Sequence, residues 1–215
     1  MNRNIEIFKE KMEKEYKKIE EDVKRPNIIL LGSTGSGKSS LINLIFGAEV
    51  AKAGTGKPVT KHIEKFDNPE NGVVLYDSAG YETGSEQQAQ FYNEVVDFAF
   101  GEEKTAEEKM HLVWYCIDSG SLRVIDLDFK LIRSFIDKNI PTCVVLTKAD
   151  QVSVSESEEL EKAILNEIKD INIFSVTNKN LGEGDYLDLH ALIEWSADNL
   201  DEGLKESFIR TQLRG

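Results

Sequence analysis

The sequence is poor in the residues that mark secreted or membrane-spanning proteins. Only two of its 215 residues are cysteines, Cys116 and Cys143, and both lie in apolar stretches that favour buried, reduced thiols over a disulfide or a metal pair. No apolar run approaches the roughly 18 to 20 residues that span a bilayer. The first residues, MNRNIEIFKEKMEKEYKK, are too charged for a secretory signal and too acidic for a transit peptide. Together these absences predict a cytoplasmic protein.

Positive charge is also scarce. Lysine and arginine number 26 against 39 aspartate and glutamate residues, which gives a formal net charge of -13. Such an acidic chain should repel a nucleic-acid backbone, so we expect no direct nucleic-acid binding. Any phosphate-bearing ligand must therefore be held locally, by backbone amides and a few well-placed cations.

Apolar stretches alternate with helical patterns between Pro26 and about residue 200. NIILLG, HLVWYCID, PTCVVLT and INIFSV are continuous apolar runs, as expected of parallel strands that are buried on both faces. HIEKFD and GVVLYDS predict a hairpin with a turn at NPENG. Helical patterns lie at about 38–47 and within 81–110, 126–139, 155–170 and 185–200. This order predicts an α/β domain with a mainly parallel sheet, one antiparallel strand, and helices on both faces.

Two helical segments flank this domain. In residues 1–25, apolar side chains recur every three or four residues, which predicts an amphipathic helix that either packs on the domain's own flank or binds a partner. Residues 201–215 keep a helical spacing of apolar residues without a stop signal, so they either pack locally or begin a further region beyond Gly215. We expect membrane association only through such a further region.

A glycine-rich segment, GSTGSGKSS at 32–40, follows the first strand and opens the first helix of the domain. It fits the phosphate-loop pattern G-x-x-x-x-G-K-[ST] through Gly32, Gly37, Lys38 and Ser39. Lys38 suits the β- and γ-phosphates, and the Ser39 hydroxyl suits one position on Mg²⁺. Backbone amides of such a loop form an anion-binding nest. The residues expected to contact a nucleotide there are Ser33, Thr34, Gly35, Ser36, Gly37, Lys38, Ser39 and Ser40.

Two further motifs follow apolar strands downstream. In DSAG, Asp77 can hold Mg²⁺ through a water, and the N–H of Gly80 can meet a γ-phosphate. In TKAD, which contains Thr147, Lys148 and Asp150, the aspartate can accept hydrogen bonds from the N1–H and the exocyclic amine of guanine. Adenine lacks that pair of donors, and the Lys148 stem can lie along the base. This motif therefore favours a guanine nucleotide.

In this order, and with SVT at 175–177, the motifs resemble those of the small P-loop GTPase G domain. GKSSLINLIFG and the GKPVTKHIEKF loop resemble the Era-like branch of the translation-factor-related GTPases. The resemblance covers about residues 26–200. It implies a three-layer fold with a six-stranded sheet, GTP and GDP as ligands with Mg²⁺, and hydrolysis of GTP to GDP by a nucleotide-dependent molecular switch.

The resemblance also implies roles for residues around the base and the first switch. Ser175 and Val176 would complete the base pocket through backbone amides, and Thr147 stands where the family usually has asparagine, which can weaken the guanine preference. A switch threonine must reach Mg²⁺ and the γ-phosphate. Thr55 and Thr60 are the candidates, and Thr60 is preferred because it lies just before the strand HIEKF. The implied catalytic residues are Lys38, Thr60 and Gly80, and the implied metal-holding residues are Ser39, Thr60 and Asp77.

The group that orients the attacking water is not evident from the sequence. Tyr81 occupies the place where Ras-type enzymes carry a glutamine. The resemblance then implies slow intrinsic turnover, completed by another group, by an activating protein or by a second copy of the chain. Nearby Glu82, Gln87 and Gln88 are interpreted as solvated switch residues.

Two other positions bear on catalysis. Arg123 either acts on the phosphates or pairs with Asp126 or Asp128. Gly35 stands where some relatives hold a monovalent cation with an asparagine, so we expect no potassium stimulation by that route.

Two rival functions stay open. Tyr81 favours a nucleotide-dependent binding or scaffold module with negligible hydrolysis. An ATPase or nucleotide kinase is the other rival, but Asp150 and the lack of an evident acceptor-substrate domain or lid argue against it.

Overall fold

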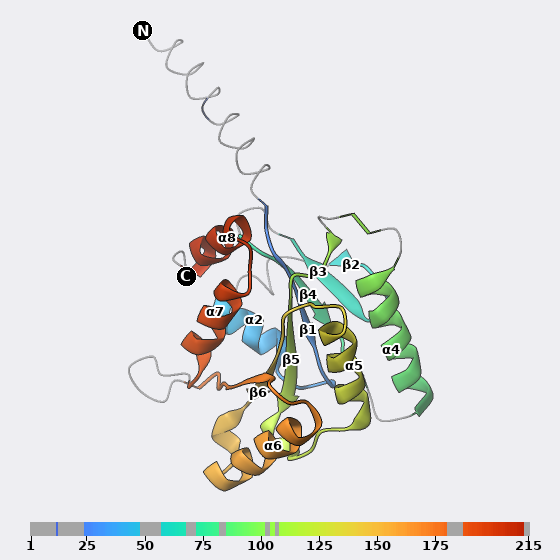
Figure 1. Ribbon diagram of the computed structural model, residues 1–215, viewed down its shortest axis with the longest axis vertical. Helices are drawn as coiled ribbons and strands as arrows, with labels where there is room; N and C mark the ends of the chain where they lie inside the picture. Colours follow the sequence, from blue (N-terminus) through green and yellow to red (C-terminus); the bar gives the residue numbers. More distant parts are fainter. Residues whose placement is uncertain are drawn as a thin grey trace.

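The computed structural model describes residues 12, 24–47, 57–67, 72–81, 85–101, 104–105, 108–179 and 187–212. Its centre is a seven-stranded sheet in the order β2-β3-β4-β1-β5-β6-β7 (Figure 1). The strands are β1 (Asn27–Leu31), β2 (Lys57–Pro58), β3 (Ile63–Phe66), β4 (Val74–Ser78), β5 (Leu112–Asp118), β6 (Thr142–Thr147) and β7 (Asn172–Ser175).

Five neighbouring strands, from β4 through β1, β5 and β6 to β7, run parallel, and β3 pairs antiparallel with β4. The predicted six strands with one antiparallel member are therefore confirmed. So is the predicted hairpin, in which Ile63 pairs with Ser78 and Phe66 with Leu75. The two-residue strand β2, which we did not expect, adds a seventh strand by pairing antiparallel with β3.

Helices cover both faces of the sheet because its central strands are apolar on both. Along β1, Ile29 and Leu31 belong to the core on one face, Ile28 and Leu30 belong to the core on the other, and all four are fully buried. This explains why the strand is one unbroken apolar run in the sequence. The α-helices are α2 (Lys38–Phe46), α4 (Ser85–Phe100), α5 (Asp126–Ile136), α6 (Val154–Glu167), α7 (Leu189–Asp198) and α8 (Glu202–Gln212), and short 3₁₀ helices η2 (Ser119–Ser121) and η3 (Ala149–Gln151) follow β5 and β6.

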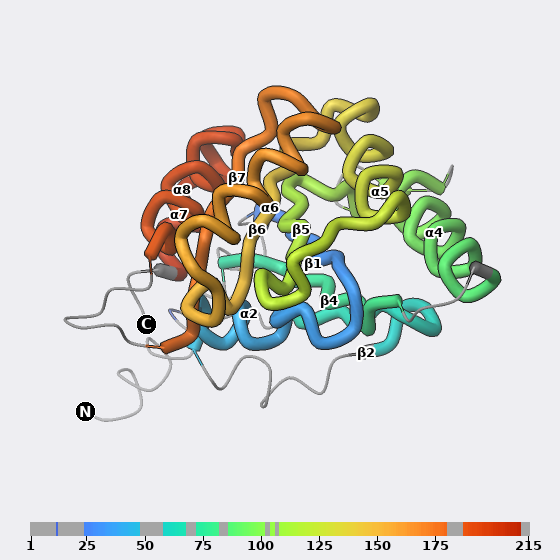
Figure 2. The backbone as a smooth tube through the Cα atoms, turned by 90° about the horizontal axis from the view of Figure 1, so that it is seen from below, coloured from blue at the N-terminus to red at the C-terminus, as the bar shows by residue number. Residues whose placement is uncertain are grey.

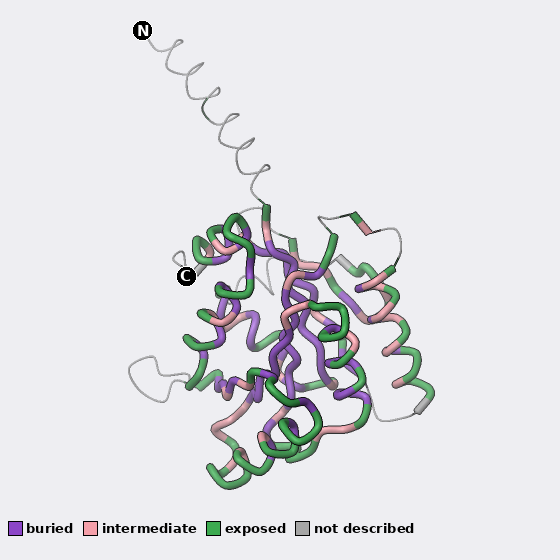
Figure 3. The backbone as a smooth tube through the Cα atoms, in the orientation of Figure 1, coloured by how far each residue is buried: buried purple, intermediate pink, exposed green. Residues whose placement is uncertain are grey.

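Each face of the sheet has its own hydrophobic core. α4, α5 and α6 contribute to one, for example through Phe91 and Phe135, and α2, α7 and α8 contribute to the other, for example through Ile42 and Phe208. Figures 1 and 2 show α4 and α5 on the side of the sheet opposite to α7 and α8. Figure 3 shows that the buried segments concentrate in the central strands. The fold is the predicted three-layer α/β arrangement.

The last described helix packs on the domain. Leu204 and Phe208 of α8 are buried in the second core. The Ser207 hydroxyl donates to the carbonyl of Gly72 at 2.8 Å, and the N–H of Gly72 donates to the Thr211 hydroxyl at 2.8 Å. Of the two alternatives for the C-terminal segment, local packing is the one observed for residues 202–212.

The helix predicted over residues 1–25 lies outside the described residues, apart from Met12, Lys24 and Arg25. Among the helices that the structure describes, none combines the length and the apolar character that crossing a bilayer requires.

Candidate functional site

The phosphate loop joins β1 to α2 at the carboxyl end of the strand. Gly37 has a φ of 85° directly before the first residue of α2, and this left-handed backbone turns the chain into the helix. The first turn of α2 opens onto a cavity of about 400 Å³. Such a helix start favours an anion, because its N–H groups lack partners within the helix. The cavity is lined by Gly35, Gly37, Lys38, Ser39, Ser40, Glu64, Asp77, Ser78, Ala79 and Lys148.

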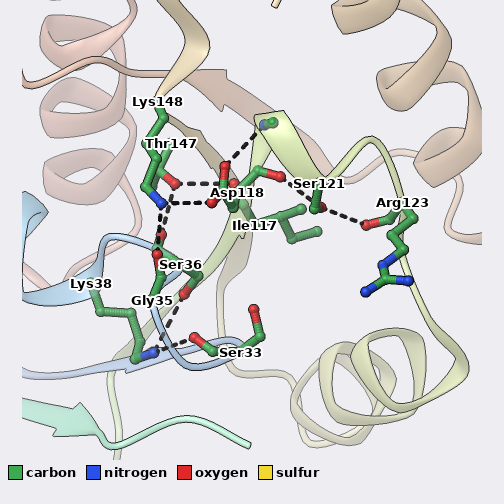
Figure 4. Close-up of polar contacts among 11 residues, drawn as sticks. Ser33, Gly35, Ser36, Lys38, Ile117, Asp118, Ser121, Arg123, Thr147 and Lys148 are labelled. Carbon is green, nitrogen blue, oxygen red and sulfur yellow. Dashed lines mark hydrogen bonds and ion pairs between the residues drawn. The ribbon is translucent and has the colours of Figure 1, made fainter. Parts of the chain in front are cut away.

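Lys38 carries the positive charge of this loop. It is only 5% exposed, and its Nζ donates to the carbonyl oxygens of Ser33 at 2.8 Å and Gly32 at 3.2 Å and to Oγ of Ser36 at 3.3 Å (Figure 4). Burial lowers the pKa of Lys38, since these neutral acceptors replace water only in part. An anion in the cavity would therefore be attracted strongly to this ammonium group.

Ser39 and Asp77 meet at the edge of the cavity. Oγ of Ser39 donates to Oδ2 of Asp77 at 2.6 Å, whereas Oδ1 of Asp77 is buried and has no hydrogen-bond partner among the described residues. Burial raises the pKa of Asp77, and the hydrogen bond from Ser39 and the charge of Lys38 oppose that rise. A hydroxyl beside an unsatisfied carboxylate offers the oxygen atoms that Mg²⁺ and its bound waters prefer, so this pair fits a magnesium site.

The DSAG segment lies directly on the phosphate loop. Gly80 has a φ of 84°, and a Cβ atom there would come within 2.5 Å of the backbone nitrogen of Thr34. The N–H of Thr34 donates to the carbonyl of Tyr81 at 3.2 Å. Only glycine allows this close approach, so the contact explains why the motif ends in Gly80.

Asp150, which is expected from the sequence to recognise the base, lies in η3 after β6. Oδ1 accepts a hydrogen bond from the Thr177 hydroxyl at 2.6 Å, and Oδ2 lies 2.6 Å from Nζ of Lys179. The hydrogen bonds from Lys179 and Thr177 lower the pKa of Asp150. The carboxylate is therefore held in the charged form that recognition of guanine requires.

A smaller cavity of about 50 Å³ extends the site towards Thr177, the hydrogen-bond partner of Asp150. It shares Gly37, Ser40 and Lys148 with the larger cavity. A ligand with a phosphate chain at one end and a planar base at the other can therefore run from one cavity into the next. The smaller cavity is lined by Gly37, Ser40, Leu41, Leu44, Thr147, Lys148, Val176, Thr177 and Asn178.

Thr147 supports the phosphate loop from below the surface. It is 6% exposed, and its hydroxyl donates to the carbonyl of Ser36 at 2.7 Å and lies 3.2 Å from the carbonyl oxygen of Ile117 (Figure 4). The Thr147 hydroxyl thus fastens the loop to β5 and β6.

Lys148 forms a second brace. Its Nζ donates to the carbonyl of Gly35 at 2.9 Å and pairs with Oδ2 of Asp118 at 2.6 Å (Figure 4). The side chain therefore crosses from β6 to the phosphate loop, and its aliphatic stem borders both cavities.

The structure corrects the expected roles of Ser175 and Val176. The N–H of Ser175 donates to Oδ2 of Asp188 at 2.9 Å, and the N–H of Val176 donates to the carbonyl of Leu146 at 2.8 Å. Neither amide is free to complete a base pocket, because both are used within the fold, although Val176 still lines the smaller cavity. The prediction was two residues too early.

Thr177 and Asn178 are the residues that sequence reasoning missed at this end of the site. Both line the smaller cavity, and Thr177 also holds Asp150. The sequence feature that could have identified these two residues is that they form a polar pair directly after the apolar strand. Glu64 was missed as well; it lies opposite Asp77 in the β3–β4 pairing and lines the larger cavity.

Thr60 is not among the residues that line either cavity. Its hydroxyl accepts at 3.2 Å from the N–H of His62, which also donates to the carboxylate of Glu94 on α4. The structure therefore brings Ser39 and Asp77 together but places the third expected metal-holding residue against a helix. The rival candidate, Thr55, lies outside the described residues.

Tyr81 follows DSAG but turns away from the cavities into the core. It is 8% exposed, and its hydroxyl donates to Oδ1 of Asp128, which also accepts from the Tyr115 hydroxyl at 2.6 Å. Burial and the charge of Asp128 raise the pKa of Tyr81 well above its usual range. Tyr81 is therefore a buried anchor and not a group that faces the phosphates.

The other candidates for catalysis are solvated or lie outside the described residues. Gln87 is exposed and Gln88 is half-buried on α4, whereas Glu82 is not among the described residues. Arg123 is exposed, and Figure 4 draws no hydrogen bond or ion pair from its guanidinium to the other residues shown. Within the described part of the chain no ion pair joins Arg123 to Asp126 or Asp128.

Comparisons with known proteins agree with this site. A family model described as 50S ribosome-binding GTPase matches residues 27–148, more than half of the chain. A probable GTP-binding protein EngB of Wolbachia pipientis is 32% identical over 164 residues, which cover 72% of this chain and 80% of that protein. Another, from Thermoanaerobacter pseudethanolicus, is 30% identical over 161 residues, which cover 72% and 81%.

Solved structures support the fold alone. A probable GTP-binding protein engB matches with a TM-score of 0.57 at 16% identity, over 88% of this chain and 99% of that one. The elongation factor SelB of Methanococcus maripaludis, in complex with the GTP analogue GppNHp, matches with a TM-score of 0.53 at 16% identity, over 84% and 35%.

These similarities confirm the GTPase class but not its Era-like branch, because the similar proteins are EngB proteins. The phosphate loop, DSAG and the start of TKAD all fall within the matched region. The chain is therefore a GTP-binding GTPase domain, and it belongs to the family of 50S ribosome-binding GTPases.

Proposed function

We propose that this GTPase domain is a nucleotide-dependent molecular switch that binds GTP and GDP with Mg²⁺ and hydrolyses GTP to GDP at a slow intrinsic rate. The observation that carries the proposal is the Ser39–Asp77 pair, a hydroxyl and a half-satisfied buried carboxylate 2.6 Å apart beside a buried lysine. This combination suits a phosphate chain that brings a divalent cation with it, and it suits a neutral ligand poorly.

The phosphate end of the ligand would occupy the larger cavity. The ammonium group of Lys38 would exchange its hydrogen bonds with neutral carbonyls for bonds with the β- and γ-phosphates. The backbone amides of residues 33–40 would surround the phosphate groups. Ser39, Asp77 and Thr60 would hold Mg²⁺, Asp77 through a water. When bound, the ion would neutralise part of the charge on the β- and γ-phosphates.

The base end would occupy the smaller cavity. Asp150, kept charged by Thr177 and Lys179, would accept hydrogen bonds from the N1–H and the amine of guanine. The Lys148 stem would lie along the base, while Thr147 supports the loop beneath it. Thr177 and Asn178, which line this cavity, would serve the base in place of Ser175 and Val176.

Hydrolysis would depend mainly on positioning. Lys38 and the N–H of Gly80 would stabilise the charge that develops on the γ-phosphate, and their fixed positions avoid reorganisation during the reaction. Because the Tyr81 hydroxyl is bound to Asp128, we expect another group to orient the water. An activating protein or a second copy of this chain would supply it.

The proposal includes the organisation of the chain. Residues 26–200 would form the G domain, residues 1–25 an amphipathic helix, and residues 201–215 a helical tail. The protein would be cytoplasmic, and its net charge of -13 disfavours direct binding to nucleic acid. The family is described by ribosome binding, so co-sedimentation with 50S subunits at low and high salt would test this partner directly.

The test is nucleotide competition followed by single-turnover hydrolysis. We expect GTP and GDP to displace a fluorescent guanine nucleotide far better than ATP does, and Mg²⁺ to strengthen GTP binding. Preference for ATP would overturn the assignment of Asp150. Hydrolysis should then be followed at several protein concentrations, because a rate that rises with concentration would show that a second copy completes the site.

A binding or scaffold module with negligible hydrolysis is the second candidate, and the buried hydroxyl of Tyr81 favours it. The same concentration series separates the two. A rate that remains at zero at every concentration, with guanine-nucleotide binding intact, would select the scaffold role.

A further inference from the structure

Glu94 of α4 binds the segment between β2 and β3 that contains Thr60. The N–H of His62 donates to Oε1 of Glu94 at 2.9 Å, and Nδ1 of His62 lies 2.7 Å from Oε2. The Thr60 hydroxyl lies beside this carboxylate, because both accept from the same N–H of His62, Thr60 at 3.2 Å. Partial burial acts to raise the pKa of Glu94, but the nearby Thr60 hydroxyl and the hydrogen bonds from His62 outweigh it and lower that pKa. The carboxylate is thus charged and fully engaged with this segment.

Thr60 is committed to this arrangement through several atoms. Its hydroxyl accepts from the N–H of His62 at 3.2 Å, the same N–H that donates to Glu94. Its own N–H donates to the carbonyl of Ile63 at 3.3 Å. Thr60 lines neither cavity, so it must leave this arrangement before its oxygen can reach a ligand there.

The same cluster reaches the DSAG motif. The N–H of Ala79 donates to the carbonyl of His62 at 2.7 Å. The His62 ring meets Phe91 edge-on with the ring centroids 6.0 Å apart, and Phe91 packs on Tyr81 at 5.7 Å. The segment that contains Thr60, the DSAG motif and α4 therefore lie against one another, and Glu94 joins that segment to the helix.

We propose that Glu94 is a positioning residue that competes with the γ-phosphate and its metal for Thr60, and that it thereby sets how strongly the domain prefers GTP over GDP. This inference rests on the proposed function, because it takes Thr60 as the threonine that GTP engages. GDP has no γ-phosphate and leaves the Thr60–Glu94 contact in place, whereas GTP must break it. A ligand shifts such an equilibrium only by its differential affinity for the two arrangements, so the contact weakens GTP binding alone.

The experiment compares the affinities of GDP and of a non-hydrolysable GTP analogue, both with Mg²⁺, by isothermal titration calorimetry. The variants are Glu94→Ala, Glu94→Gln, Thr60→Ala and the double variant Thr60→Ala/Glu94→Ala. Asp97→Asn is the matched control, because Asp97 is an exposed acid one turn further along the same helix. Glu94→Gln keeps the side-chain volume and one acceptor, so it serves if the alanine variant fails to fold.

We expect Glu94→Ala to raise the ratio of analogue affinity to GDP affinity roughly fivefold or more, and Glu94→Gln to raise it less. Thr60→Ala should lower analogue affinity and leave GDP affinity unchanged. In the Thr60→Ala background, Glu94→Ala should then change nothing, since its effect acts through Thr60. Asp97→Asn should leave the ratio unchanged.

Three results would overturn the inference: an unchanged ratio in both Glu94 variants, an equal change for both nucleotides, or the same rise when Thr60 is already alanine. If Thr60→Ala has no effect on analogue binding, the inference also fails, because Thr60 is then not the residue that GTP engages. Failure of the unaltered protein to bind either nucleotide would instead refute the proposed function, and it would be seen before any variant is compared.

Discussion

Tyr81 and Asp128 are joined by a buried hydrogen bond between residues 47 positions apart in the sequence. The carboxylate of Asp128 also accepts from the Tyr115 hydroxyl at 2.6 Å and, through Oδ2, from the N–H of Ile125 at 2.9 Å. The start of α5 thereby anchors the residue that follows DSAG. Tyr81 has a structural partner that accounts for its presence where Ras-type enzymes carry glutamine.

Tyr81→Phe should destabilise the fold without a direct effect on hydrolysis. Asp128 would lose one of its three donors in a buried place, so we expect the free energy of unfolding to fall by about 1–3 kcal/mol. The single-turnover rate should stay close to that of the unaltered chain, because the side chain faces the core. Urea unfolding and rapid-quench kinetics measure the two effects. Tyr92→Phe, at a half-buried position on α4, is the control, and a large loss of rate at unchanged stability would contradict the structural role.

Asp77→Asn should make the protein more stable and weaken its nucleotide binding. Folding raises the pKa of Asp77, so as pH rises the unfolded chain loses this proton at a lower pH than the folded chain does. The charged carboxylate therefore lowers the free energy of unfolding as pH rises from about 3.8 through the raised value. Replacing Asp77 removes that destabilisation at neutral pH. We expect a higher urea midpoint and a roughly 10- to 100-fold weaker Mg²⁺-dependent affinity for GTP. Binding measured in EDTA should change much less; an equal loss there would argue against a metal-holding role.

Asp150→Asn should change which base is recognised. The amide offers one donor where the carboxylate only accepts, so it suits xanthine, which has a carbonyl where guanine has its amine. For GTP, the amide oxygen can still accept from the N1–H, but the charge is lost and the amide NH₂ meets the guanine amine, so we expect affinity to fall roughly 100-fold or more. Competition between GTP and XTP measures the exchange. Thr177→Val is the companion variant: it removes one support of Asp150 and should weaken GTP binding without creating affinity for XTP.

Protonation of His111 should lower the free energy of unfolding in mild acid. Its Nδ1 accepts from the N–H of Asn27 at 2.9 Å, which requires a neutral ring. Burial lowers the pKa of His111, and the charge of Asp201 opposes this only in part. The unfolded chain therefore takes up a proton at higher pH than the folded chain. The contribution of the neutral ring is complete above about pH 6.5 and is lost as pH falls towards the lowered value.

Urea unfolding at several values between about pH 7.5 and pH 5.5 would measure this loss. His111→Gln keeps an acceptor but cannot take up the proton, so its stability should decline less with acid than that of the unaltered chain. His190→Gln, at an exposed position on α7, should decline like the unaltered chain. Equal slopes in all three proteins would show that other groups cause the pH dependence.

The parts of the site that could be predicted from sequence are those fixed by local patterns. Lys38 and Ser39 follow a glycine loop at the start of a helix, and Asp77 and Asp150 follow apolar strands, so chain order alone gathers them at one edge of the sheet. The hairpin and the parallel strands followed in the same way from apolar runs and turns.

The parts that could not be predicted depend on contacts between distant segments or on a strand's last residue. The strand β7 ends at Ser175 and its backbone bonding continues through Val176, so the residues free to form the site are Thr177 and Asn178. An apolar-to-polar change in sequence marks such a boundary only to within a few residues. The bonds of His62 to Glu94 and of Tyr81 to Asp128 join separate elements, and no spacing rule connects them.

The braces at Thr147 and Lys148 have a consequence for how a ligand would leave. Both side chains run from the strand that carries the base-recognition motif to carbonyls of the phosphate loop, at Ser36 and Gly35. Because these two side chains join the two ends of the site, binding at one end should strengthen binding at the other. Guanosine and pyrophosphate, added as separate molecules, would therefore bind cooperatively with each other. Dissociation would accordingly proceed as one concerted opening of both ends, and a partner that loosens either brace would act as an exchange factor.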